Sequence, residues 1–226
     1  MFVALRILYA PEMSAGEIER LVAELKALAL QLPAVRDAWV APVSPVAVIN
    51  AGQIVWRMTF ATESEALLAP ASSLWRERIA PLLKEAVTVS IGYRMTQSWM
   101  RRTGPGIWRA LLLRVMDHAE PALVRRLAET TLLLGSHTPE IRSWALSPVT
   151  HSDGAKAFSY VWEQEFDSVA DLTGPYMTSP THWGVVDAFF DAECPEYIVD
   201  PHLIQVVGAI DQSIMETVGT QPPATF

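Results

Sequence analysis

Related motifs occur in the same order in the two halves of this chain. Val55–Phe60 (VWRMTF) is matched by Val161–Phe166 (VWEQEF), an offset of 106 residues. Pro33–Arg36 (PAVR) is matched by Pro139–Arg142 (PEIR) at the same offset. A duplicated unit of about 105 residues has the size of an ordinary domain. The predicted parts are a first half, a linker, a second half and a C-terminal tail, at residues 1–100, 101–106, 107–207 and 208–226.

Apolar residues recur at strand and helix periods in both halves. Pro121 and Pro180 suit the first turn of a helix, where a missing backbone N–H does no harm. In the second half we predict strands at 108–116, 141–147, 157–166 and within 197–207, helices at 121–136 and 180–190, and a loop at 148–156. In the first half we predict strands at 2–10, 39–49, 53–61 and 87–95, and helices at 15–31 and 63–83. Each half therefore has the order β-α-β-β-α-β, a ferredoxin-like unit.

A four-stranded sheet with helices on one side leaves its other face bare, and a second copy can cover that face. We therefore predict an α+β fold in which two ferredoxin-like halves pack sheet to sheet as an intrachain pseudo-dimeric α/β barrel. Arg57 and Glu163 occupy matching positions of the repeat with opposite charge. Both lie on the predicted inter-sheet face, opposite Trp56 and Trp162. We expect them to form an ion pair between the halves, because an unpaired charge there would be costly.

Composition narrows the classes of partner. The net charge of −8, with 17 Lys and Arg residues and no basic block, disfavours nucleic acid and anionic membranes. The single cysteine, Cys194, allows no internal disulfide, which fits a reducing, cytoplasmic location. Glu193 and Glu196 flank it and should raise its thiol pKa, so a structural role is favoured over a nucleophilic one. The apolar start of the chain, interrupted by Arg6, predicts a strand and not a signal peptide.

Three motifs in the second half resemble the stress-responsive A/B barrel family, also called the Dabb or dimeric α/β barrel family. They are Tyr160–Asp167 (YVWEQEFD), Tyr176–Trp183 (YMTSPTHW) and Val199–Pro201 (VDP). The resemblance covers roughly residues 107–207, and the first half shares it through the repeat, as a tandem copy. The family includes a plant polyketide cyclase, a plant hydroxynitrile lyase and many bacterial proteins without a known role, so the fold alone does not determine activity.

The cyclase members imply a histidine on the second helix and a tyrosine six residues before it, and His182 and Tyr176 match these positions. They also imply a histidine on the first strand and a tyrosine on the first helix. This chain departs from both, with Arg109 and Thr131 near those positions. The resemblance therefore implies the place of a pocket more directly than it implies the cyclase reaction.

These residue types suit proton transfer next to a carbonyl group. His182 can act as a general base or acid because imidazole titrates near neutral pH. Tyr176 can donate a hydrogen bond to a developing oxyanion, and Arg109 can bind a carboxylate or enolate oxygen. Tyr160 and Trp162 would form an aromatic wall for a flat substrate, and Thr131 would line the same pocket. Such a site requires no metal and no other cofactor.

Structural roles remain open for each candidate. His182 can bond a backbone carbonyl at a helix start, Tyr176 can simply satisfy its hydroxyl, and Arg109 can lie in solvent. Tyr160 and Trp162 are more often core residues than substrate contacts. The first half contains no histidine, so its expected role is to act as a scaffold.

Other polar residues give weaker signals. The remaining histidines show no metal-ligand spacing; they are His118, His137, His151 and His202. His202 could approach the pocket mouth. Asp187 and Asp191 follow His182 and could orient its imidazole, although exposed aspartates at a surface are more common.

The leading interpretation is a cofactor-independent lyase or cyclase acting on a small aromatic or polyketide-like carbonyl compound. The alternatives are a non-catalytic small-molecule-binding or stress-response protein and, more weakly, a cofactor-free monooxygenase. The expected partner is a small-molecule substrate. Residues 208–226 carry Ile210, Ile214 and Met215 at near-helical spacing and would be the segment to mediate a homodimer.

Overall fold

The structure is a computed structural model that describes residues 1–153 and 157–218. The strands of the first half are β1 (Phe2–Tyr9), β2 (Asp37–Pro42), β3 (Ile54–Phe60), β4 (Val87–Arg94) and the short β5 (Ser98–Met100). The strands of the second half are β6 (Gly106–Leu113), β7 (Ser143–Ser152), β8 (Tyr160–Phe166) and β9 (Ile204–Ile210). The main helices are α1 (Ala15–Ala29), α2 (Glu63–Leu68), α3 (Ala80–Leu83), α4 (Pro121–His137) and α5 (Val169–Asp171).

Shorter helical turns complete the second helical region of each half. The first half has the 3₁₀ turn η1 (Ala69–Ala71) and the π turn η2 (Trp75–Ile79). The second half has the π turns η3 (Leu172–Tyr176) and η4 (His182–Val186), followed by the 3₁₀ turn η5 (Asp187–Phe189). Pro175 lies inside η3, where it lacks an N–H for regular helical bonding. The region is therefore a chain of short turns, and such turns often lie at functional sites.

The strands follow one another in the order β2-β3-β1-β4-β7-β8-β6-β9, with β5 paired to β7. In each half the fourth strand lies beside the first, followed by the third and the second, which is the ferredoxin-like arrangement. The halves join where β4 pairs with β7. At the opposite seam, the backbone N–H of Ser44 donates to the carbonyl of Val207 over 2.7 Å. The sheet is thus a nearly closed barrel, and the predicted fold class is confirmed.

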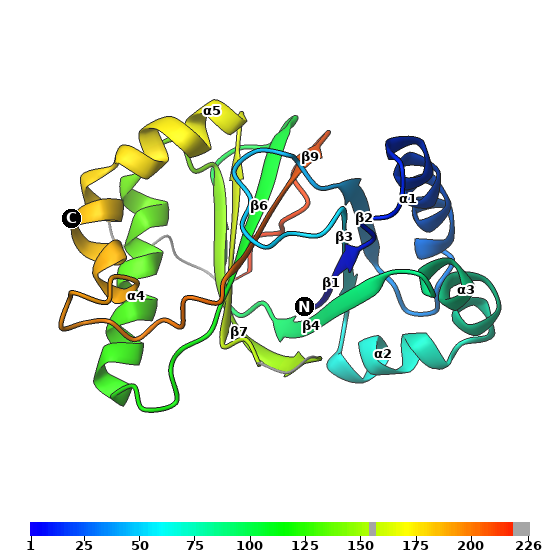
Figure 1. Ribbon diagram of the computed structural model, residues 1–226, viewed down its shortest axis with the longest axis horizontal. Coiled ribbons are helices and arrows are strands. Elements are labelled where there is room, and N and C mark those ends of the chain that lie inside the picture. The colour runs from blue at the N-terminus through cyan, green and yellow to red at the C-terminus, as the bar shows by residue number, and fades with distance from the viewer. Residues whose placement is uncertain (154–156, 219–226) are drawn as a thin grey trace.

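Figure 1 shows the strands in the middle of the molecule, with α1, α2 and α3 outside one half and α4 and α5 outside the other. Strand alternation explains this layering, since successive side chains point to opposite faces of a sheet. One face of each sheet points into the barrel, where Leu5, Val55, Trp108 and Val161 belong to one buried cluster. The other face packs against its own helices in a separate cluster for each half. A cavity between sheet and helices is therefore lined mainly by residues of one half.

Arg57 and Glu163 meet inside the barrel. Arg57 Nε lies 2.8 Å from Glu163 Oε1, and the side chains are 1% and 0% exposed. Trp108 Nε1 also donates to Glu163 Oε1 over 3.1 Å, and Arg57 Nη1 donates to the carbonyl of Ile214 over 3.0 Å. The expected ion pair between the halves is confirmed.

Two expectations about local structure are wrong. Strand β7 continues through Ser152 and pairs with β4, so residues 148–152 are strand and not loop; part of that predicted loop, 154–156, lies outside the described residues. Strand β2 ends at Pro42, and residues 43–53 are a long connection instead of strand. The segment after Ile210 is not helical as far as residue 218, and Met215 is buried in the barrel cluster. Ile214 and Val218 also pack against the barrel cluster, so the near-helical spacing belongs to a non-helical segment.

None of the helices in residues 1–153 and 157–218 combines the length and apolar character that a membrane span requires.

Reversing one charge of the buried pair should destabilise the protein strongly. Arg57→Glu or Glu163→Arg leaves two like charges inside the barrel, and we expect each to lower the free energy of unfolding by about 3 kcal/mol or more. The double exchange restores opposite charges and should recover part of this loss. Urea unfolding followed by tryptophan fluorescence measures the effect.

Lys84→Glu is the matched control, because Lys84 and Glu85 lie 3.8 Å apart with side chains that are each 71% exposed. Its effect should stay within about 0.5 kcal/mol. A single reversal at Arg57 or Glu163 as mild as this control would contradict a role for the pair in holding the halves together.

Candidate functional site

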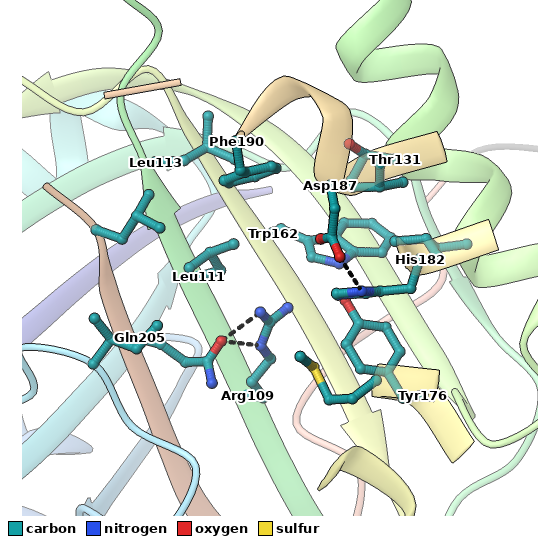
Figure 2. A pocket seen from close by; sticks show the side chains of 15 residues that line it. Arg109, Leu111, Leu113, Thr131, Trp162, Tyr176, His182, Asp187, Phe190 and Gln205 are labelled. Atoms are coloured by element: carbon teal, nitrogen blue, oxygen red, sulfur yellow. Dashed lines mark hydrogen bonds and ion pairs between the residues drawn. The ribbon is translucent and has the colours of Figure 1, made fainter. Parts of the chain in front are cut away.

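A cavity of about 200 Å³ lies between the sheet of the second half and its helices. Its polar lining comes from β6, β9, α4 and the turns η3 to η5, as Figure 2 shows. The polar lining residues are Arg109, Thr131, Tyr176, His182, Asp187 and Gln205. The apolar ones are Ile49, Leu111, Leu113, Leu134, Trp162, Met177, Val186, Phe190 and Leu203. The site is thus a largely apolar cavity with a few convergent polar groups, the form typical of small-molecule pockets.

The alternation of side chains along a strand determines which residues line the cavity. On β6, Arg109, Leu111 and Leu113 line the cavity, whereas Ala110 and Leu112 belong to the barrel cluster. Trp162 on β8 reaches the cavity by the same rule, and its neighbour Glu163 points into the barrel. The register that pairs the two halves therefore also determines which side chains face the cavity.

His182 opens the π turn η4 and lies in the wall of the cavity with a side chain that is 11% exposed. Its Nδ1 is 3.4 Å from Asp187 Oδ2, a long contact that becomes an ion pair when the imidazole is protonated. Within the described residues this contact does not reach the geometry of a hydrogen bond, so it is electrostatic, and the described hydrogen bonds include none at Nε2. Asp187 can therefore orient the ring while Nε2 stays free for a ligand.

Burial lowers the pKa of His182 below the ordinary value of an imidazole. The nearby Arg109 charge lowers this pKa as well, and Asp187 acts in the opposite direction. His182 is consequently neutral at neutral pH, the form that can accept a proton.

Tyr176 ends the π turn η3 and is 1% exposed. Its ring packs edge to face against His182, with ring centroids 4.7 Å apart, and against Phe166 at 5.4 Å. Arg109 lies over the same ring, with Cζ 5.6 Å from the centroid. The phenol, the imidazole and the guanidinium thus face one space (Figure 2).

Arg109 is 4% exposed and is held by two neutral amides. Its Nε donates to Gln205 Oε1 over 2.9 Å, and its Nη2 donates to the same oxygen. Its Nη1 donates to Gln164 Oε1. Burial lowers the pKa of Arg109, and Tyr176 opposes this shift. The expectation that Arg109 could lie in solvent is wrong.

The first half contributes to this cavity through the connection between β2 and β3. Ile49 forms a two-bond bridge with Gln205, with N···O distances of 3.0 and 2.8 Å, and it lines the cavity. Gln205 Nε2 donates to the carbonyl of Ala47 over 2.7 Å. Asn50 Nδ2 donates to the carbonyl of Leu203 over 2.9 Å. The first half therefore contributes directly to the cavity wall, in addition to the scaffold role expected from the sequence.

Sequence reasoning missed Ile49 and Gln205, and it favoured an exposed surface position for Asp187 over the contact with His182 that the structure shows. Ala47 and Asn50 have φ values of 60° and 47°, in the left-handed region that asparagine tolerates better than most residues. Asn50, Ala51 and Gly52 contain residue types that are common in turns, but a turn at these residues indicates only where the strands are connected. Nothing in the sequence of the first half indicated that the connection would reach β9 of the second.

Five of the six predicted site residues line the cavity: Arg109, Thr131, Trp162, Tyr176 and His182. Tyr160 is not among its lining residues and packs, partly buried, at the edge of the second-half core. The structure thus brings together the polar candidates and separates one of the two aromatic ones from them.

The other polar candidates lie apart. His202 does not line the cavity, and its ring packs against Phe158 with centroids 6.4 Å apart. Asp191 accepts a bond from the backbone of Glu193 over 2.9 Å, so it stabilises a turn. Desolvation, Asp191 and the two neighbouring glutamates raise the pKa of Cys194, in the direction that the sequence predicted.

No group of three or more His, Cys, Asp or Glu side chains that could hold a metal occurs in residues 1–153 and 157–218.

The sequence model of the "Stress responsive A/B Barrel Domain", or Dabb, matches residues 107–207. This half of the chain is a stress-responsive A/B barrel domain. The match contains most of the cavity wall described above, including Arg109, Tyr176 and His182. No curated protein matches the sequence.

Solved structures resemble the whole chain, so the first half takes part in the same fold as the Dabb half. An anthrone oxidase-like protein superposes with a TM-score of 0.70 at 9% identity, covering 100% of this chain and 96% of its own. A candidate monooxygenase from Lactobacillus acidophilus NCFM gives 0.55 at 10% identity, with coverages of 92% and 97%. A second candidate monooxygenase, from Fusobacterium nucleatum, gives 0.55 at 4% identity, with coverages of 100% and 98%. At these identities the likeness concerns the fold alone.

The His182 environment predicts opposite responses to two substitutions. Asp187→Asn removes an interaction that favours the imidazolium and should lower the pKa of His182 further. Arg109→Gln removes a repulsive charge and should raise that pKa. NMR titration of the His182 ring signal, assigned with His182→Gln, measures both, and equal shifts in one direction would contradict the arrangement.

The same lowered pKa predicts a loss of stability in mild acid. An unfolded histidine titrates near about 6.5, so below that pH the unfolded chain binds this proton more readily than the folded one. The stability that His182 contributes is therefore present above about pH 6.5 and is lost as the pH falls toward the folded-state pKa. Urea unfolding at a series of pH values should show a smaller acid loss for His182→Gln than for the unmodified protein.

Proposed function

We propose that the cavity binds a small aromatic or polyketide-like carbonyl compound and that the protein acts on it as a cofactor-independent lyase or cyclase. In this proposal His182 accepts a proton from the carbon next to the carbonyl group. The observation that carries it is the convergence of a neutral imidazole, a phenol and a buried guanidinium on one apolar cavity. Proton transfer needs such a base, and the enolate that it produces needs such donors.

The reaction would proceed in two proton transfers. His182 Nε2 takes the proton, and the electron pair of the broken C–H bond forms an enolate. Tyr176 donates a hydrogen bond to the enolate oxygen, and the charge of Arg109 stabilises the negative charge that develops in the cavity. The enolate carbon then attacks a second carbonyl group of the substrate, and the imidazolium returns its proton to the resulting alkoxide. The reverse sequence breaks a C–C bond, so the same residues serve a cyclase or a lyase.

Cavity size limits the substrate. A dry cavity of about 150 Å³ accommodates benzene, so about 200 Å³ suits one ring or a compact pair of rings. Trp162, Leu111 and Phe190 supply apolar contacts for a flat ring system. A longer substrate would extend past Ile49 and Met177, which line the cavity and are 42% and 46% exposed.

The proposal predicts proton exchange before any full turnover is known. With 2-tetralone in D₂O, the unmodified protein should accelerate deuterium incorporation next to the carbonyl group, as followed by mass spectrometry. His182→Gln should lower this acceleration by about 100-fold or more, because it removes the general base. His202→Gln is the matched control, since His202 is exposed and does not line the cavity.

Two results would count against the catalytic role. One is a folded His182→Gln variant that exchanges deuterium as fast as the unmodified protein. The other is tight binding of aromatic ketones without any exchange, which would favour the non-catalytic small-molecule binder.

A cofactor-free oxygenase is the second candidate. The same deprotonation yields a carbanion in an apolar space that dioxygen can enter, and the structurally similar proteins include one named anthrone oxidase-like. Oxidation of anthrone would convert its CH₂ group to a second carbonyl, consuming one O₂ and releasing one water. We expect any oxygen uptake in the presence of anthrone, measured with an oxygen electrode, to disappear in His182→Gln. Deuterium exchange without oxygen uptake would favour the lyase or cyclase.

A further inference from the structure

We infer that the ligand of this cavity is an anion, with a carboxylate or ionised phenol oxygen that pairs with Arg109. The inference names the substrate class of the proposed function and rests on that function. Its basis is an unbalanced charge in the cavity wall.

The buried arginines of the described chain differ in how their charge is balanced. Arg57 pairs with Glu163 at 2.8 Å. Arg142 lies 3.9 Å from a carboxylate oxygen of Glu165 and 3.4 Å from one of Asp167. Arg109 is as deeply buried as these two, yet within residues 1–153 and 157–218 it has no carboxylate within ion-pair distance. A buried cation without a counter-charge is costly, so such a residue commonly belongs to a binding site.

The partners of Arg109 hold its orientation without neutralising it. A guanidinium has five N–H donors, and three of them point to the amide oxygens of Gln164 and Gln205. One N–H on each terminal nitrogen is left over. The guanidinium faces the space shared with Tyr176 and His182 in Figure 2. Guanidinium N–H groups on the two terminal nitrogens can bind the oxygens of a carboxylate.

Gln205 is itself fixed by the first half. Its Nε2 donates to the carbonyl of Ala47 over 2.7 Å, so its Oε1 must face Arg109. Its backbone is bridged to Ile49. A guanidinium held in this way is preorganised, and the ligand does not have to order it.

The remaining groups of the cavity leave this charge available. Asp187 is the acidic side chain in the wall, but it is 46% exposed and contacts His182 instead of Arg109. Tyr176 and Thr131 are neutral. A ligand that brings a negative oxygen to Arg109 would place its ring against Trp162 and Leu111 and its reactive carbon within reach of His182.

Binding of matched neutral and anionic aromatic compounds tests the inference directly. Isothermal titration calorimetry of benzoate and benzamide at neutral pH should give a Kd for benzoate that is at least about tenfold lower. The pair 4-nitrophenolate and nitrobenzene, measured at a pH where the phenol is ionised, distinguishes a phenolate from a carboxylate as the preferred source of the anion. Equal affinity within both pairs, or no binding of either anion at about 10 mM, would overturn the inference.

Gln164→Glu supplies the missing counter-charge from within the protein. Gln164 is 0% exposed and its Nε2 has no hydrogen-bond partner among the residues that the structure describes, so the substitution removes none of the described bonds and places a carboxylate beside Arg109. We expect it to raise the melting temperature and to abolish the preference for benzoate. Gln212→Glu makes the same chemical change at an exposed position and should alter neither. A Gln164→Glu variant that still prefers benzoate contradicts the inference.

His182→Gln separates this inference from the proposed function. It should abolish deuterium exchange and leave the preference for benzoate intact, because the anion pairs with Arg109. An intact preference without exchange in the unmodified protein would refute the catalytic proposal alone, and exchange without any preference would refute the anionic ligand alone.

Discussion

The ion pair between Arg57 and Glu163 determines how the two halves of this molecule face each other. Both residues lie on strands whose inward faces fill the barrel, and both are almost completely buried. A slip of one residue in either sheet would turn the charged side chain toward the helices and leave its partner unpaired. The pair therefore does more for register than for net stability, since a buried ion pair can be matched energetically by apolar packing. The indole of Trp108 and the carbonyl of Ile214 bond to it as well, so the second half and the C-terminal segment are fixed by the same contact.

Side chains alternate between the two faces of β8, and this alternation links the Arg57–Glu163 pair to the cavity. Glu163 and Glu165 point into the barrel, whereas Trp162 lines the cavity and Gln164 bonds to the arginine beside it. Glu165 in turn accepts bonds from Ser213 and from the backbone of Ile214, which hold the C-terminal segment across the barrel end. The barrel seam and the cavity wall are thus two faces of one strand. A change that shifts the strand to improve one face must disturb the other.

The sequence predicted the features that follow from the internal repeat and from side-chain alternation along strands. It did not predict contacts between segments that are far apart in the chain. Matching motifs at one offset predicted the two halves, the barrel and the Arg57–Glu163 pair, because a period of two residues assigns every side chain to a face. The motif around His182 predicted the helical side of the cavity. Ile49 and Gln205 could not be foreseen in the same way, since they meet through a connection whose path depends on left-handed residues at Ala47 and Asn50. The near-helical spacing of Ile210, Ile214 and Met215 did not reveal that Met215 is buried in the barrel cluster, because apolar spacing alone does not determine which surface a tail packs against.

The corresponding π turns of the two halves explain why one of them has this cavity. The turn η2 begins with Trp75, which stacks on Trp56 with ring centroids 5.5 Å apart and planes 9° apart. The turn η4 begins with His182, on the side of Trp162, the repeat equivalent of Trp56. The larger ring packs directly on the sheet in the first half, whereas the smaller ring of the second half leaves room above it. The next residue, Trp183, points outward and is 63% exposed, so it does not fill that space.

The register of β1 and β6 on their partner strands sets Ala4 opposite Met58 in the first half and Arg109 opposite Gln164 in the second. The two halves therefore share a backbone pattern but differ in the side chains that line their pockets: a pocket of about 140 Å³ lies beside Ala4 and Arg6 in the first half, and the cavity of about 200 Å³ lies beside Arg109 and His182 in the second.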